Sequence, residues 1–365
     1  MTVIIFLIIL AILVLVHELG HFITAKKSGI RVDEFGIGFP PTVFSWKPKK
    51  SETKYSLNLI PFGGFVKIFG EDPDEASIRG PESKRSLTNK PKSIQILVLA
   101  SGIIFNIIFA WALLSFGFMW GLPLTIDETN EQYAQNIDLT ITAVLPDSPA
   151  EGAELKTGDN IIELVQGSFI LENPNSDEVK EFISKNGEKE FLLKYRRGKE
   201  LGEVSLIGNK EILENEIAVG IGLDRVGIVK FPFLKSIKEG TVTTIKLLGL
   251  ITVGLANFIS DAFTGEADFS QVSGPVGIIG LVGNASALGF VYLLTFTALI
   301  SLHLAIINLI PFPALDGGRI LFVIIESIKG SPISPKIQNW INGIGFALLI
   351  LLMFVITYND ILKLF

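Results

Sequence analysis

The 365-residue chain contains no cysteine and only three histidines. The absence of cysteine excludes disulfide bonds, thiolate nucleophiles and cysteine-bound metal sites. Any bound metal must therefore be held by histidine, aspartate or glutamate. Charged residues make up 19% of the chain and its net charge is −6. Because no basic stripe with interleaved aromatic residues occurs either, the sequence argues against nucleic-acid binding.

Apolar residues are abundant and occur in long runs. They make up 48% of the chain, and the mean hydropathy is +0.50. These values indicate a membrane protein with room for a soluble domain. The first run, within residues 1–28, has no basic segment before it and keeps polar residues where a signal peptide would be cleaved. We therefore predict that it is a transmembrane helix and not a signal peptide.

This first run reads LVLVHELGHFI at its centre, and His17, Glu18 and His21 are its only ionisable side chains. Ionisable groups are costly in hydrocarbon, so they mark a functional site. Positions i and i+4 share one face of a helix, so the two histidines can bind one cation. Glu18 points about 100° away, where it can reach a metal-bound water. The pattern favours catalytic zinc over a hydrogen-bonded histidine pair in a helix-bundle core.

Residues 29–92 precede a second predicted span at 93–120. Runs at 32–39 and 55–69 are rich in Phe, Ile, Leu and Gly, which predicts β-hairpin elements that lie against the membrane-embedded site. A free strand edge there could accept a substrate as an added strand, although a simple packed cytoplasmic hairpin fits the sequence as well. In the second span, Asn106 is the one strongly polar residue near mid-membrane. It could line the site or bond a neighbouring helix.

Residues 121–228 have the composition of a soluble α+β domain, with a helix expected at 176–186. The stretch LTITAVLPDSPAEGAELKTGDNIIEL resembles a PDZ domain of the bacterial protease type, except that Glu154 stands where glycine is common. A generic small α+β module is the alternative. PDZ domains bind extended peptides or C-termini by strand addition, so such a peptide is the expected partner.

The remaining chain has two further predicted spans. In 229–286 we expect an interfacial amphipathic helix and a glycine-rich connection, because the uncharged run 247–260 is short for a bilayer and suits an interfacial or re-entrant segment. The third span, within 287–320, ends in NLIPFPALDGGR, where two prolines stop the helix and Asp316 marks a functional site. The segment 321–365 contains a loop and the fourth span. The expected fold is a polytopic α-helical membrane protein with about four transmembrane helices, β-hairpin elements and an inserted PDZ-like domain.

The basic residues of the first loop predict that it lies in the cytoplasm. The N-terminus and the PDZ-like domain would then be extracytoplasmic, and spans one and three would run in the same direction. His17 and His21 lie about 21 and 27 Å along the first helix, and Asp316 reaches a similar depth. We therefore expect the two motifs to meet near the cytoplasmic side of the membrane.

The paired motifs, HExxH early and NxxPxPxxDG late, with a PDZ-like insert between them, resemble the site-2 protease family (peptidase family M50). The likeness is to the bacterial metalloproteases of regulated intramembrane proteolysis, of the RseP type. It implies that His17, His21 and Asp316 bind one Zn²⁺, that Glu18 activates water and that Asn308 holds the substrate backbone or oxyanion. It also implies a multi-pass protein of the bacterial cell membrane. Its substrates would be single-span proteins already shortened outside, such as anti-sigma factors, and remnant signal peptides.

One position departs from the family pattern: His303 stands where these proteases usually carry asparagine. We expect His303 to line the cavity and not to be a fourth ligand, since a fourth protein ligand would leave no position for water. Two other functions use the same residues. A metal transporter is disfavoured because the spans hold few further polar residues. An inactive, PDZ-bearing adaptor is disfavoured by the intact Glu18.

Overall fold

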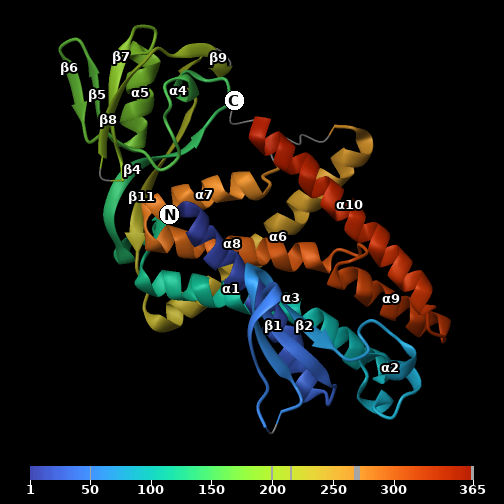
Figure 1. Cartoon of the computed structure of the whole chain (residues 1–365). Coiled ribbons are helices and arrows are strands. Elements are labelled where there is room, and N and C mark those ends of the chain that lie inside the picture. The colour runs from blue at the N-terminus through green and yellow to red at the C-terminus, as the bar shows by residue number, and fades with distance from the viewer. Residues whose placement is uncertain (50, 199, 214–215, 267–271, 363–365) are drawn as a thin grey trace. The chain divides into compact units, whose positions relative to one another are not determined.

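The computed structural model describes residues 1–49, 51–198, 200–213, 216–266 and 272–362 (Figure 1). The chain forms two compact units. The first contains Met1–Phe116 and Ile237–Phe365, and the second, Gly117–Ser236, is inserted between these two parts.

The described residues contain five helices that are long and apolar enough to cross a membrane: α1 (Thr2–Lys27), α3 (Lys92–Trp120), α6 (Phe233–Thr264), α8 (Phe290–Leu309) and α10 (Pro335–Leu362). A shorter apolar helix, α7 (Pro275–Leu288), and an amphipathic helix, α9 (Asp316–Lys329), complete the larger helices of the first unit. The segment after the hairpin holds the short helix α2 (Glu75–Arg79) and two 3₁₀ turns, Ser83–Arg85 and Leu87–Asn89. This composition fits a polytopic membrane protein with five candidate spans, where the sequence predicted about four.

The additional candidate span is α6, which the sequence predicted as a membrane-surface helix. The prediction counted only the uncharged run and took the preceding charges as a boundary. The helix includes these charged residues, and its total length is 32 residues. A stripe of small side chains lets α6 pack closely on α3. A Cβ at Gly240 would lie only 2.2 Å from Ser115 Oγ, and Thr244 is 4% exposed. Close packing through small residues is typical of helices within membranes.

Two further segments predicted as connections are helical. The later part of the glycine-rich stretch forms α7, which begins with Pro275 in the first turn, a position that favours proline, while residues 267–271 of the stretch lie outside the described residues. Asp360 of α10 accepts hydrogen bonds from the backbone N–H groups of Gly274 (3.1 Å) and Gly277 (2.8 Å), which would otherwise be unpaired at this helix start. The predicted loop after residue 320 is mostly α9. Low helix propensity of glycine was thus outweighed by capping and packing.

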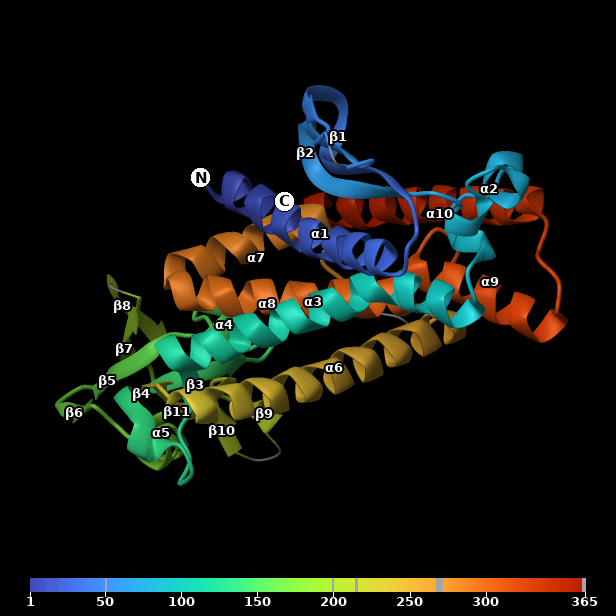
Figure 2. The same cartoon turned by 90° about the horizontal axis from the view of Figure 1, so that it is seen from below.

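Figure 2 shows the helices of the first unit, and two of its apolar side-chain clusters join helices around the candidate site. One joins α3, α6 and α8 around Ala110, Leu114, Ala298 and Leu302. The other joins α1, α7 and α8 around Leu13 and its neighbours. The helices that carry most of the candidate site are therefore held together by side-chain packing.

The predicted hairpin is confirmed as β1 (Val32–Trp46) and β2 (Lys54–Ile68), which pair antiparallel. Both strands bend, so Ile37 pairs with Leu57 and also with Gly64. Apolar residues of both strands share a cluster with α1 and α3, including Phe35 and Val66.

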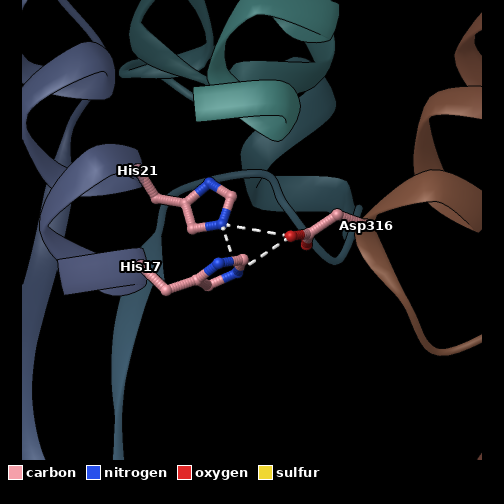
Figure 3. A group of neighbouring side chains, drawn as sticks. All are labelled: His17, His21 and Asp316. Atoms are coloured by element: carbon pink, nitrogen blue, oxygen red, sulfur yellow. Dashed lines mark hydrogen bonds and ion pairs between the residues drawn. The ribbon is translucent and has the colours of Figure 1, made fainter. Parts of the chain in front are cut away.

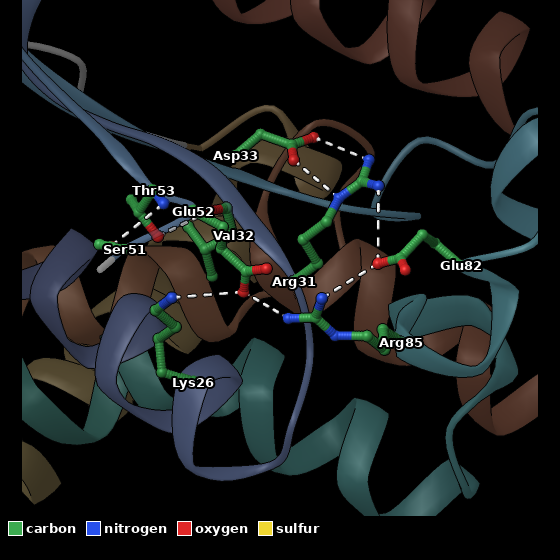
Figure 4. A network of polar contacts seen from close by, with 9 residues as sticks. All are labelled: Lys26, Arg31, Val32, Asp33, Ser51, Glu52, Thr53, Glu82 and Arg85. Carbon is green, nitrogen blue, oxygen red and sulfur yellow. Dashed lines mark hydrogen bonds and ion pairs between the residues drawn. The ribbon is translucent and has the colours of Figure 1, made fainter. Parts of the chain in front are cut away.

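A polar network ties this hairpin to the end of α1 (Figure 4). Lys26 lies 3.5 Å from the carboxylate of Glu52, and Arg85 pairs with the same carboxylate. The hydrogen bond from Arg85 lowers the pKa of Glu52. Thr53 donates a hydrogen bond to the carbonyl of Val32 (2.8 Å). The hairpin is therefore anchored at its base beside α1.

The second unit is an α+β module, as predicted. Its main sheet has the order β3-β11-β4-β5-β7-β8, with β6 paired to β5. The strands are β3 (Leu122–Thr125), β4 (Ala134–Val144), β5 (Asn160–Gln166), β6 (Phe169–Glu172), β7 (Phe191–Arg197), β8 (Glu200–Leu206) and β11 (Ile221–Val229), with a separate pair β9 (Asn209–Leu213) and β10 (Glu216–Ala218). Besides α4 (Pro149–Gly152) and the 3₁₀ turn Glu131–Tyr133, the unit contains α5 at Ser176–Asn186, where the sequence placed a helix. Its core includes Ile141, Leu164, Val179 and Phe191.

Candidate metal centre

The two histidines of the HExxH motif lie on one face of α1, as the spacing predicted. His17 is 8% exposed and His21 is 7% exposed. The Nδ1 atom of His21 lies 2.8 Å from the carbonyl oxygen of Val98 on α3. Since a carbonyl can only accept, Nδ1 carries the proton and Nε2 of His21 presents a lone pair. This is the tautomer that binds a metal through Nε2.

Asp316 reaches the same place from a distant part of the sequence. The helix α8 ends at Leu309, and after a turn α9 begins at Asp316. The turn is tight: a Cβ at Gly317 would lie 2.3 Å from the carbonyl oxygen of Leu309, and one at Gly318 would lie 2.2 Å from that of Phe312. Only glycine fits at these two positions, which explains the Gly-Gly pair after the aspartate.

The three side chains converge on one point (Figure 3). The Oδ2 atom of Asp316 lies 3.0 Å from Nε2 of His17 and 3.3 Å from Nε2 of His21. The two Nε2 atoms are 3.2 Å apart. Ligands about 2.0–2.1 Å from a tetrahedral zinc are about 3.3 Å from one another, so these separations fit a zinc ion. Two imidazoles and one carboxylate also leave the fourth position for water.

Asn106 of α3 contacts the cluster. From the sequence, this residue could either line the site or bond a neighbouring helix. Its side chain is fully buried, and its Nδ2 atom lies 3.3 Å from Nδ1 of His17. A His17 that binds metal through Nε2 must donate from Nδ1, so the amide oxygen and nitrogen of Asn106 are exchanged in that state. Asn106 therefore bonds the neighbouring helix at the site itself.

Gly102, one turn before Asn106, lets α3 approach both histidines. A Cβ at this position would lie 2.4 Å from Nε2 of His21 and 2.6 Å from Cε1 of His17. Small residues of this kind allow close contact between membrane helices. The four-residue spacing from Gly102 to Asn106 places both on the face towards α1.

Glu18 lies beside the second strand of the hairpin. Its carboxylate accepts a hydrogen bond from the backbone of Val66 and interacts electrostatically with His21 and Asp316. A Cβ at Gly64 would be 3.8 Å from Cγ of Glu18. The hairpin thus contacts the HExxH motif, as the sequence predicted.

A charged pair lies one turn beyond Asp316. Arg319 pairs with Glu71 and lies 3.3 Å from the carboxylate of Asp72. Burial raises the pKa of Glu71, while the guanidinium of Arg319 acts to lower it. The pair connects α9 to the segment that follows β2.

Two other predicted site residues lie on α8, outside the three-residue cluster. His303 is exposed, and its Nδ1 bonds to the carbonyl oxygen of Leu299 at 2.9 Å. The position therefore agrees with a residue that is not a ligand of this cluster, and its cavity-lining role stays a prediction. Asn308 is partly exposed, and its side chain makes no hydrogen bond within the described residues. Its role in substrate binding also stays a prediction.

The sequence matches a known family along almost its whole length. The model of peptidase family M50 matches residues 5–352. The zinc metalloprotease RasP of Oceanobacillus iheyensis is 31% identical over 428 residues, which cover 100% of this chain and 99% of that protein. The zinc metalloprotease RasP of Shouchella clausii is 30% identical, and the regulator of sigma-W protease RasP of Bacillus subtilis is 29% identical, both with the same coverage. The chain therefore belongs to peptidase family M50, whose members are zinc-dependent metallopeptidases.

Proposed function

We propose that this protein is an intramembrane zinc endopeptidase in which His17, His21 and Asp316 bind one zinc ion and Glu18 is the general base. The observation that carries the proposal is the convergence of three ligand atoms within 4.8 Å of one another, two of them on an apolar helix that is long enough to span a bilayer. Burying such groups in a membrane is costly unless they serve a function.

The chemistry follows from the residues around the ligands. Zinc supplies a Lewis acid that lowers the pKa of a water and polarises the scissile carbonyl group. Glu18 takes the proton of the attacking water and delivers it to the nitrogen of the leaving amine. The hydrogen bond from the backbone of Val66 orients the Glu18 carboxylate for both transfers. Asn308, on the helix that leads to Asp316, would hold the substrate backbone or oxyanion, and the exposed His303 would line the cavity.

A transmembrane substrate must first be unwound, because helical amides are hydrogen-bonded and inaccessible. The second half of β2 supports an extended binding mode. Within the described residues, the only strand that Gly64–Ile68 pairs with is the first half of β1, so no second strand pairs with this segment, where Val66 bonds to Glu18. An unwound substrate could add to this segment as a strand.

We further propose that the substrates are single-span membrane proteins already shortened outside the membrane, such as anti-sigma factors, and remnant signal peptides. A relative named regulator of sigma-W protease supports the first class. In the second unit, a cavity of about 500 Å³ lies between α5 and residues 217–223. Its lining is mostly apolar, and Lys180 is the charged residue among the lining residues. It suits an extended apolar peptide or C-terminus, in agreement with a PDZ-like role.

For the location, we propose the bacterial cell membrane, with the N-terminus and second unit outside and the active site towards the cytoplasm. Lys26 and Lys27 end α1, and a basic loop follows them. Such a loop favours the cytoplasmic side.

The test is cleavage of a short single-span reporter by the purified protein, compared with E18Q. We expect E18Q to bind zinc with unchanged affinity but to cleave at least about 10²-fold more slowly, because the general base is lost. A zinc chelator should abolish cleavage by the wild type. Wild-type protein that binds zinc and transports it without cutting any reporter would contradict the proposal.

A further inference from the structure

The segment that delivers Asp316 to the metal centre has an unfavourable backbone conformation. Ala314, two residues before the ligand, has a φ angle of 73°. An L-residue rarely adopts this left-handed conformation, because its Cβ approaches the backbone. Such a conformation persists only where surrounding contacts enforce it.

One face of α10 supplies those contacts. Gln338, Asn342 and Gly345 are spaced by four and three residues, so they lie on the same side of this helix. The Oδ1 atom of Asn342 accepts a hydrogen bond from the backbone N–H of Ala314 (3.3 Å). Gly345 packs against Pro313, the residue before Ala314. A Cβ at Gly345 would lie only 2.5 Å from Cβ of Pro313.

The same face also holds the far end of α9. Nε2 of Gln338 donates to the buried carboxylate of Glu326 (3.0 Å), which also pairs with Lys92 of α3 at 2.5 Å. The helix that begins with Asp316 is therefore attached to α10 at both ends. Towards the other end of α10, Asp360 accepts hydrogen bonds from the start of α7.

We infer that Asn342 is a positioning residue for Asp316: it holds Ala314 in its left-handed conformation and so places the carboxylate against the two histidines. This inference rests on the proposed zinc site. Asn342 touches neither the ligand atoms nor a substrate, and it acts through the backbone of the 310–315 turn. A polar side chain within an apolar span is consistent with such a role, because its burial needs a compensating partner.

The test measures zinc affinity of the full-length purified protein in detergent by competition with a chromophoric chelator. We expect N342A to bind zinc about tenfold more weakly, as is common when support of a metal ligand is removed. The matched control is N339A, which makes the same chemical change on the same helix. Asn339 is exposed and makes no hydrogen bond within the described residues, so N339A should bind zinc like the wild type.

A second variant separates positioning from general loss of structure. Glycine adopts positive φ without strain, so A314G should remove the need for the clamp. We expect A314G/N342A to recover zinc affinity to within about threefold of the wild type. The inference is overturned if N342A retains wild-type zinc affinity, or if its loss is not recovered in the double variant. Wild-type protein that binds no zinc would instead refute the proposed function.

Discussion

Replacing Gly102 by alanine tests the geometry of the metal centre directly. The new methyl group would lie 2.4 Å from Nε2 of His21, whereas ordinary contacts begin at 3.4 Å. The shortfall is therefore about 1 Å. The rings cannot turn away freely, because His21 bonds to the carbonyl of Val98 and His17 contacts Asn106. Either α3 must move outward or the two ligand atoms must separate.

We expect G102A to bind zinc about 10²-fold more weakly and to cleave a reporter about 10²-fold more slowly. We expect this loss because moving a catalytic group by about 1 Å can lower the reaction rate about 10²-fold. The assays are chelator competition and reporter cleavage, with thermal unfolding as a check on folding. In a helix interior, glycine to alanine otherwise stabilises by about 0.5–1 kcal/mol, so a general propensity effect has the opposite sign.

The matched controls are G254A on α6 and G343A on α10. A Cβ at either position would have no atom within 4 Å. Both variants should retain zinc affinity and cleavage. Wild-type zinc affinity in G102A would refute the close approach of α3 to the ligands, and equal losses in the controls would show that the effect is not local.

Two further predictions concern a ligand partner and the anchoring of the hairpin. N106A should weaken zinc binding by about 10–100-fold in the same competition assay. N106D keeps an acceptor oxygen for Nδ1–H of His17, so it should recover most of the lost zinc affinity. If N106D does not recover it, the proposed tautomer of His17 is contradicted. The pKa of Glu52 is lowered from 4.5 by the hydrogen bond from Arg85, so this pair stabilises the fold above that pH and its contribution disappears as the pH falls through the lowered value. R85Q should therefore reduce the unfolding temperature more at about pH 7 than at about pH 3, and an equal reduction at both would count against the pair.

The convergence of the three candidate ligands could be predicted from the sequence because its signals are local and chemically unusual. His17 and His21 are ionisable residues in an apolar helix, and their spacing alone places them on one face. Asp316 was a candidate because prolines break the preceding helix and two glycines follow. Helix rise and loop charge were sufficient to predict that these motifs meet, and the distances of 3.0 and 3.3 Å agree.

The partners of the site were harder to predict because they depend on packing between helices. Nothing in the second span distinguishes an Asn106 that contacts His17 from one that bonds any other helix. The length of α6 was missed for a related reason. Its charges suggested an end to the helix, whereas contact of Gly240 with Ser115 depends on which face meets α3.

The three proposed ligands are not held equally firmly. His17 and His21 belong to one helix, so their relative position follows from helix geometry, and α3 supports both rings. Asp316 arrives after a break in the chain and depends on a turn that contains a left-handed alanine. The structural requirements at this turn are correspondingly strict: glycine at 317 and 318, and glycine at 345 on the facing helix. Substitutions that weaken the metal centre without touching a ligand should therefore be concentrated around the Asp316 turn, where small contacts oppose an unfavourable backbone conformation.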